Sequence, residues 1–209
     1  MRLTTTSFED RGVIPSRFAL AQAAAEGHVT FADNVNPALN WSDPPVGTRS
    51  FALICHDPDV PSSAEDVNQE GREVPSDLPR VEFIHWVVVD LPADLREIKE
   101  GEFCTAVRPR GKAGGLGPHG CREGLNDFSG WFSGDSNMEG QYHGYDGPAP
   151  PWNDSLVHEY VFTLYAVDLE KVPVEGSFTA NEVREAIAGH VLAEAEVSGT
   201  YTQNPRLLA

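Results

Sequence analysis

The feature that most constrains the fold is the run from Val157 to Asp168 (VHEYVFTLYAVD), in which apolar side chains occupy both alternating sets of positions. A strand that is apolar on both faces is typical of the interior of a sheet. Two further runs are Ser50 to His56, which is short and apolar, and Phe83 to Leu91, which is rich in β-branched and aromatic residues. The first is expected to stop at the Asp-Pro step that begins at Asp57. Glu194 to Tyr201 alternates well enough for a late strand, so the chain is predicted to be mostly β.

Few segments have helical spacing. Thr179 and Glu182 have the spacing of a capping box, in which each side chain bonds the backbone N–H of the other residue at a helix start. Apolar side chains follow at helical intervals, so we expect a helix from about Asn181 to His190. His190 would lie in the last turn, where a positive charge suits the helix dipole. Pro92 to Ile98 is long enough for one short turn.

Two segments have the composition of long loops. Ser62 to Arg80 is polar and contains two prolines, and Arg108 to Pro151 is rich in glycine and proline. Loops longer than about 12–15 residues in a compact domain are usually functional or disordered. Residues typical of an ordered, buried cover occur in the second segment, namely Trp131, Phe132, Tyr142 and Tyr145. Because no repeat or low-complexity linker divides the chain, we expect one domain over residues 1–209, with insertions near 62–80 and 111–146.

The charge of the chain excludes several classes of partner. It has 15 Lys and Arg against 32 Asp and Glu, a net charge of −17 and a pI near 4.6. Nucleic acids and anionic bilayers attract basic surfaces, so neither is an expected partner. No run approaches the ~20 apolar residues of a membrane span, and the N-terminal segment does not resemble a secretory signal. Cys55, Cys104 and Cys121 follow no CxxC spacing, so we expect reduced thiols, no zinc site and a cytoplasmic location.

Polar residues at the predicted strand ends form the first candidate site. They are His56, Asp57 and Asp59 after the first run, His85 inside the second, and His158 near the start of the longest one. A buried imidazole or carboxylate is costly unless it is paired. These groups therefore either form separate structural hydrogen bonds or converge on one small polar pocket. Because alternate residues share a strand face, Tyr160 would lie next to His158 along the wall of such a pocket.

Other motifs give weaker signals. Gly111 to Gly120 has the glycines of a phosphate-binding loop, but no strand is predicted before it and no helix after it. Cys121 would need an activated thiolate to act as a nucleophile, and no neighbouring residue in the sequence provides one. The five strand-end residues are metal-ligand types without a diagnostic metal-binding spacing. His119 and His143, in the glycine-rich segment, are expected to be exposed.

Three motifs occur in a recognisable order. Asp57 to Ser62 (DPDVPS) comes first, His85 to Val89 (HWVVV) second, and Gly147 to Pro151 (GPAPP) leads into His158 to Tyr165 (HEYVFTLY). With supporting segments over residues 10–203, this order resembles the phosphatidylethanolamine-binding protein family. Within that family it is most similar to the bacterial Raf-kinase-inhibitor-like branch.

The resemblance implies a Greek-key β-sandwich of two antiparallel sheets with one or two short helices near the C-terminus. It also implies a small pocket for an anionic group such as a phosphoryl head group, and no cofactor, metal ion or catalytic residue is assigned. The residues that match the family's motifs are Asp57, Asp59, His85, Pro150, Pro151, His158 and Tyr160. The family's usual His-Arg-Tyr is His-Glu-Tyr here, so Glu159 lies on the strand face opposite to His158. The two insertions could fold over the pocket mouth.

The leading hypothesis is a binding protein for a small phosphorylated or anionic ligand, acting as a regulator or inhibitor of a partner protein, with a homodimer left open. The alternatives are a hydrolase or metal-dependent enzyme that uses the same His and Asp residues, and a sandwich with a vestigial pocket. Protonation of His85 or His158 would add donors for phosphate oxygens, so anion binding is expected to strengthen at lower pH. Because the net charge of −17 opposes an anion, either the pocket is locally shielded or the ligand also carries a positive group.

Overall fold

The computed structural model describes residues 1–208. Its strands are β1 (Arg2–Thr4), β2 (Ala21–Ala23), β3 (Val29–Phe31), β4 (Leu39–Ser42), β5 (Ser50–Pro61), β6 (Arg80–Pro92), β7 (Glu97–Ile98), β8 (Gly111–Lys112), β9 (Arg122–Glu123), β10 (Gln141–Tyr142), β11 (His158–Val167) and β12 (Val191–Tyr201). Its helices are α1 (Phe128–Trp131) and α2 (Ala180–Ile187), with single 3₁₀ turns at Ser16–Phe18 and Pro118–Gly120. The fold is therefore mostly β, as predicted.

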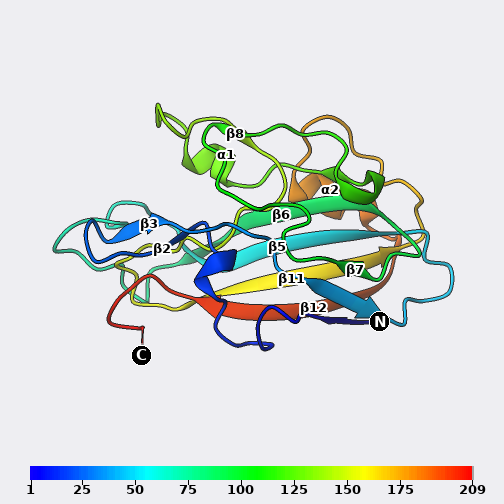
Figure 1. Cartoon of the computed structure of the whole chain (residues 1–209). Coiled ribbons are helices and arrows are strands. Elements are labelled where there is room, and N and C mark those ends of the chain that lie inside the picture. The colour runs from blue at the N-terminus through cyan, green and yellow to red at the C-terminus, as the bar shows by residue number, and fades with distance from the viewer. Residues whose placement is uncertain (209) are drawn as a thin grey trace.

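The largest sheet has five antiparallel strands in the order β12-β11-β5-β6-β9 (Figure 1). A three-stranded antiparallel sheet, β1-β4-β7, packs against one of its faces, and α2 packs against the other. β11 lies beside β5 although the two strands are far apart in the sequence, with Val161 opposite His56. The predicted sandwich of antiparallel sheets is confirmed, and the pairing of β11 with β5 brings the start of one strand close to the end of the other.

Apolar side chains cover both faces of the central strands. Between the two sheets, Leu53 and Trp86 of the large sheet pack in one cluster with Leu39 of β4. On the opposite face, Ile54 and Val87 pack in a second cluster that includes residues of α2. Alternation along a strand sends neighbouring residues to opposite faces, so a strand covered on both sides is apolar throughout. The same reason accounts for the doubly apolar pattern of β11.

The strand that begins at Ser50 does not stop at Asp57, and this prediction was wrong. β5 continues to Pro61, pairing with β6 through Val60 opposite Val81. The ladder with β11 stops at His56, so one edge of β5 no longer needs backbone donors beyond that point. A proline, which has no N–H, is tolerated at such an edge, and a register shift between Asp57 and Val60 accommodates it.

The capping box forms as predicted, but the helix is shorter than expected. The Thr179 side chain accepts a hydrogen bond from the backbone N–H of Glu182, and the Glu182 side chain accepts one from the N–H of Thr179. α2 ends at Ile187 because Gly189 has a positive φ of 82°, a left-handed conformation that commonly ends helices. His190 therefore lies beyond the helix, where its Nδ1 bonds the Asp168 carboxylate at 2.8 Å.

The segment 111–146 contains short elements rather than a bare loop. β8 and β10 pair in parallel, an exception to the antiparallel pattern. Tyr142 and Tyr145 are buried as expected, whereas Trp131 is about half exposed, at 49%. His143 is buried, so its predicted exposure was wrong. Its ring nitrogens bond the Lys112 carbonyl at 2.9 Å and the Ser177 hydroxyl at 3.1 Å, interactions between segments that sequence spacing does not indicate.

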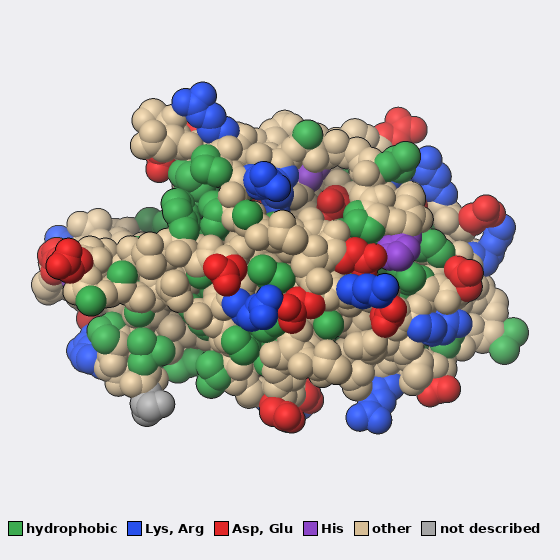
Figure 2. All heavy atoms as spheres, viewed as in Figure 1, with side chains coloured by type: hydrophobic (Ala, Val, Ile, Leu, Met, Phe, Trp, Pro, Cys, Tyr) green, Lys and Arg blue, Asp and Glu red, His purple; other side chains and the backbone are tan. Residues whose placement is uncertain are grey.

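Acidic and basic side chains are interspersed on the face shown in Figure 2 rather than gathered into separate patches. Several form ion pairs at the surface, including Arg49 with Glu170 and Arg184 with Glu82. Exposed pairs of this kind contribute little to stability because water and salt screen them. Within the described range, no helix has the length and apolar character that a membrane crossing requires.

Candidate functional site

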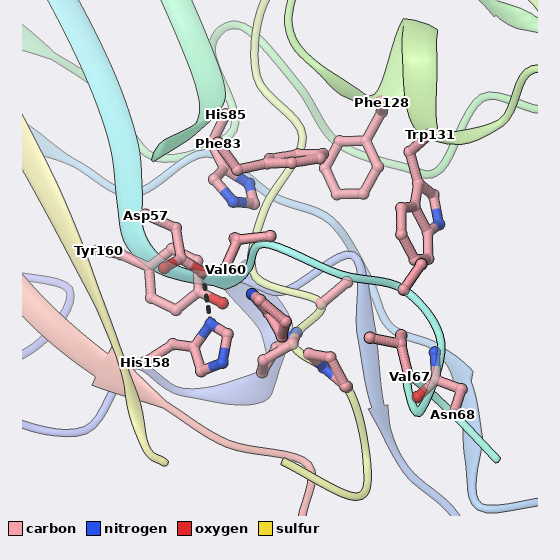
Figure 3. Close-up of a pocket in the computed structure, with 15 residues that line it drawn as sticks. Asp57, Val60, Val67, Asn68, Phe83, His85, Phe128, Trp131, His158 and Tyr160 are labelled. Atoms are coloured by element: carbon pink, nitrogen blue, oxygen red, sulfur yellow. Dashed lines mark hydrogen bonds and ion pairs between the residues drawn. The ribbon is translucent and has the colours of Figure 1, made fainter. Parts of the chain in front are cut away.

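A narrow cavity of about 60 Å³ lies where β5, β6 and β11 meet the loops at one end of the large sheet (Figure 3). The predicted site residues that line it are Asp57, His85, Pro150, Pro151, His158 and Tyr160. Clefts for drug-sized ligands are usually about 300–1,000 Å³. The cavity therefore suits a small chemical group, and a larger ligand would have to extend beyond it.

Strand register explains why these side chains converge. β5 lies between β6 and β11, with His56 opposite Ile84 on one side and Val161 on the other. His158 and Tyr160 are two residues apart on β11 and therefore share a face. His85 of β6 reaches the same space, and its ring centroid is 5.1 Å from that of Tyr160.

His158 is held between two carboxylates. Its Nδ1 is 2.8 Å from Oδ2 of Asp57, and its Nε2 is 3.0 Å from Oδ2 of Asp154 (Figure 3 shows the Asp57 contact). Carboxylates accept hydrogen bonds and do not donate them, so both ring nitrogens must carry protons. Burial alone would lower the pKa of His158, but the hydrogen bonds with Asp154 and Asp57 outweigh it and raise the pKa to about 9. His158 is therefore an imidazolium ion at neutral pH.

Arg80 completes an ionic chain behind the cavity. Its two terminal nitrogens donate to the two carboxylate oxygens of Asp154 at 2.6 and 3.1 Å. Burial would raise the pKa of Asp154, but the hydrogen bonds from His158 and Arg80 hold it below its usual value. Asp57, His158, Asp154 and Arg80 thus alternate in sign, and their charges sum to zero. Paired and hydrogen-bonded in this way, the charges tolerate burial.

His85 presents its free nitrogen to the cavity. Its Nδ1 donates to the backbone carbonyl of Asp146 at 2.8 Å, and Nε2 has no hydrogen-bond partner among residues 1–208. Burial lowers the pKa of His85, outweighing the nearby carboxylate of Asp57 and the hydrogen bond to Asp146. The neutral form at pH 7 therefore has its proton on Nδ1 and a lone pair on Nε2. That lone pair accepts a hydrogen bond from a ligand, and protonation converts it into a donor.

The Tyr160 hydroxyl is the second polar group of the cavity; its geometry gives it no hydrogen bond within the described chain, but it lies close enough to the Asp57 carboxylate to interact with it. Burial, together with the neighbouring Asp57 carboxylate, raises the pKa of Tyr160 well above its usual value, so the phenol stays protonated. The remaining walls are largely apolar, with Phe83, Phe128 and Trp131 along one side (Figure 3). Two unsatisfied polar atoms in an apolar surround are typical of a specific small-molecule site.

The sequence profile of the family described as phosphatidylethanolamine-binding protein matches residues 4–202. The chain belongs to the phosphatidylethanolamine-binding protein family. It is 35% identical over 201 residues to a UPF0098 protein of Methanothermobacter thermautotrophicus, which covers 96% of this chain and 98% of that protein. The UPF0098 protein YbhB of Escherichia coli is 30% identical over 204 residues, covering 97% of this chain and 100% of YbhB.

Solved structures agree with this assignment. Escherichia coli YbcL, described as a new member of the mammalian PEBP family, matches with a TM-score of 0.67 and 26% identity, over 96% of this chain and 97% of YbcL. The homologue CT736 of Chlamydia trachomatis matches with a TM-score of 0.61 and 28% identity, over 96% of this chain and 95% of CT736. The predicted family resemblance is confirmed, and membership supports a ligand-binding role of the phosphatidylethanolamine-binding protein fold.

Two of the polar strand-end residues that were candidates for a shared pocket lie outside the cavity lining. Asp59 accepts a hydrogen bond from the backbone N–H of Glu159 at 2.8 Å and holds β5 to the start of β11. His56 lies 3.8 Å from Glu82 and is not among the lining residues. Among residues 1–208, no three His, Cys, Asp or Glu side chains are grouped so that they could hold a metal ion. Burial raises the pKa of Cys121 to about 12, so it has no activated thiolate.

Several site residues were not predicted from the family's motifs. Both long segments supply walls of the cavity, Val67 and Asn68 from the 62–79 loop and Phe128 and Trp131 from the 111–146 segment. Asp154 and Arg80 were also missed, because neither lies in a predicted apolar run and their pairing depends on the path of the loop before β11. The expectation that His158 could donate to a ligand is wrong, since both of its N–H groups are already used.

Proposed function

We propose that the cavity binds the phosphoryl head group of a small ligand that carries a hydrogen-bond donor of its own. The observation that carries this proposal is the pair of unpartnered polar atoms in the cavity, Nε2 of His85 and the hydroxyl of Tyr160. At neutral pH the first is an acceptor and the second is a donor. A phosphomonoester P–OH or an ammonium group can donate to Nε2, while a phosphate oxygen accepts from Tyr160.

The charge of the chain favours such a ligand over a simple anion. The ionic chain behind the cavity is neutral in sum, and the lining includes no Lys or Arg among the described residues. The net charge of −17 repels an anion at long range. A head group with its own ammonium, such as phosphoethanolamine, is less strongly repelled and offers N–H donors as well as phosphate oxygens.

The binding of phosphoethanolamine is expected to strengthen as the pH falls below about 6.5, the ordinary pKa of histidine. Because burial keeps the pKa of His85 below that value, the affinity should rise only at acidic pH. There the proton between Nε2 and the phosphate can come from protonated His85 or from the P–OH of the ligand, whose second phosphate pKa is about 6. Isothermal titration calorimetry from pH 5 to 8 should give an affinity at least about tenfold higher at pH 5, a difference of one pKa unit in linkage.

The variant His85→Ala should bind weakly, with an affinity nearly independent of pH. His119→Ala is the matched control, because His119 pairs with Glu102 away from the cavity and should leave the pH profile unchanged. A wild-type affinity that stays flat from pH 5 to 8 would argue against a role for His85. Absence of binding at every pH would reject the proposed head group.

A further inference from the structure

Asp154 joins the floor of the cavity to the base of the 62–79 loop. It is fully buried, and its carboxylate bonds His158 at 3.0 Å, both terminal nitrogens of Arg80, and the backbone N–H of Leu156 at 3.0 Å. Its backbone carbonyl accepts from the Asn204 side chain at 2.7 Å. With every polar group bonded, the carboxylate has one position, so the oxygen facing Nε2 of His158 is fixed.

A fixed carboxylate on each side leaves one stable charge state for His158. A neutral imidazole has a lone pair on one ring nitrogen, and here that lone pair would face an ionised oxygen at 2.8 or 3.0 Å. Two acceptors facing each other without a proton repel, and burial makes the repulsion stronger. The contact with Asp57 alone would not force His158 to be cationic. A neutral ring can donate its single N–H, on Nδ1, to Asp57 and keep an unprotonated Nε2.

We propose that Asp154 is a positioning residue that keeps His158 cationic, so that His158 cancels the charge of Asp57 and the cavity can accept a phosphate group. This inference rests on the proposed function and adds a residue outside the family's motifs that sets the cavity's charge. Arg80 is the counterpart that makes a second buried carboxylate tolerable, because without it the chain of charges would sum to −1. His158 then acts through Asp57 and does not itself touch the ligand.

The surroundings of His158 add no competing charge. The titratable and charged groups around it are Asp57 and Asp59 of β5, Arg80 and His85 of β6, Tyr160 of β11, Tyr201 opposite it on β12, and Asp154 in the preceding loop. Tyr160 and Tyr201 stay protonated because burial raises their pKa values, that of Tyr201 to about 12. His85 is neutral near pH 7, which leaves the carboxylates of Asp57, Asp59 and Asp154 and the guanidinium of Arg80 to determine the charge of His158.

The test compares the Asp154→Asn variant with the wild type. An amide nitrogen in the place of Oδ2 can donate to Nε2 of a neutral imidazole, while the amide oxygen in the place of Oδ1 still accepts from Nη2 of Arg80 and Nη1 keeps its bond to the Asp59 carbonyl. His158 can therefore lose its proton near neutral pH. Phosphoethanolamine affinity is measured in both proteins at each pH from 6 to 8, and the ratio of variant to wild type cancels the titration of the ligand and of His85. The ratio is expected to be near or above one at pH 6 and to fall about tenfold by pH 8.

A second measurement keeps the inference testable if the variant does not fold. ¹⁵N NMR of the ligand-free wild type should show both ring nitrogens of His158 protonated at pH 8. For the affinity measurement, the control is Asp66→Asn, which removes the carboxylate paired with Arg72 in the 62–79 loop. The ratio of its phosphoethanolamine affinity to that of the wild type should not depend on pH.

Each outcome has one meaning. A ratio that is reduced equally at all pH values would make Asp154 merely structural and overturn the inference, as would a wild-type His158 that loses a proton below pH 7. If the wild type does not bind phosphoethanolamine at all, the proposed function fails. The NMR titration then still decides whether His158 is held protonated between its two carboxylates.

Discussion

Replacing His158 with glutamine is expected to lower the free energy of unfolding by about 3–5 kcal/mol, the usual cost of removing one partner from a buried ionic network. The substitution leaves Asp57 and Asp154 as two buried carboxylates without the cation that both contact. An amide can donate to one of them but supplies no charge. Urea denaturation at pH 7 measures the difference, and a loss below about 1 kcal/mol would mean that the carboxylates are compensated elsewhere.

The stabilisation that His158 provides should decrease as the pH rises. The pKa of His158 is about 9 in the folded protein against 6.5 for an unperturbed histidine. A raised folded-state pKa contributes stability that is complete below pH 6.5 and is lost as the pH rises to 9. The wild type should therefore lose roughly 3 kcal/mol between pH 6.5 and 9 that His158→Gln does not lose. His190→Gln is the control, because its pairing with Asp168 is exposed and should contribute less than about 1 kcal/mol.

The second large effect is expected from Asn153→Ala, which should release the 62–79 loop. The buried side chain of Asn153 accepts from the backbone N–H of Asn68 at 2.9 Å and donates to the carbonyl of Asp66 at 2.8 Å, with longer contacts to Gln69 and Arg72. Each such bond contributes about 0.5–1.5 kcal/mol, and more where a buried group is left unpaired. Amide protection in residues 62–79 should fall at least about tenfold, and proteases should cleave there.

Release of the 62–79 loop in Asn153→Ala should also weaken phosphoethanolamine binding, because Val67 and Asn68 form part of the cavity wall. Asn36→Ala is the matched control. Asn36 is also a buried asparagine whose side chain bonds four backbone groups, in Pro37, Lys99, Phe103 and Cys104, so its removal should loosen residues 99–104 and leave 62–79 protected. Equal hydrogen exchange of residues 62–79 in Asn153→Ala and wild type would show that other contacts hold the loop.

The sequence predicted the strands well because strand periodicity is local. β11 could be identified from its doubly apolar pattern, and the start of α2 from Thr179 and Glu182. It failed where an element's end depends on its neighbours. β5 continues through Pro58 because its pairing with β11 ends at His56, so a proline there removes no ladder hydrogen bond. His143 is buried because the segments that contain Lys112 and Ser177 pack against it.

The candidate site divides in the same way. Asp57, His85 and His158 could be identified because polar groups inside or beside apolar strands require partners. Asp154 and Arg80 could not, since both lie outside the predicted apolar runs and meet only because the loop before β11 returns to the start of β6. The aromatic wall of Phe128 and Trp131 likewise comes from a segment with little periodicity.

By itself the sequence determined a mostly β chain of the phosphatidylethanolamine-binding protein family, with buried histidines and an acidic surface. Only the tertiary structure decided what those histidines can do. His158 is surrounded by acceptors and is fixed as a cation, whereas His85 donates to a carbonyl and keeps a lone pair for the cavity. The physical reason is that the charge and donor state of an imidazole depend on which atoms lie opposite its two nitrogens, and those atoms come from distant parts of the chain.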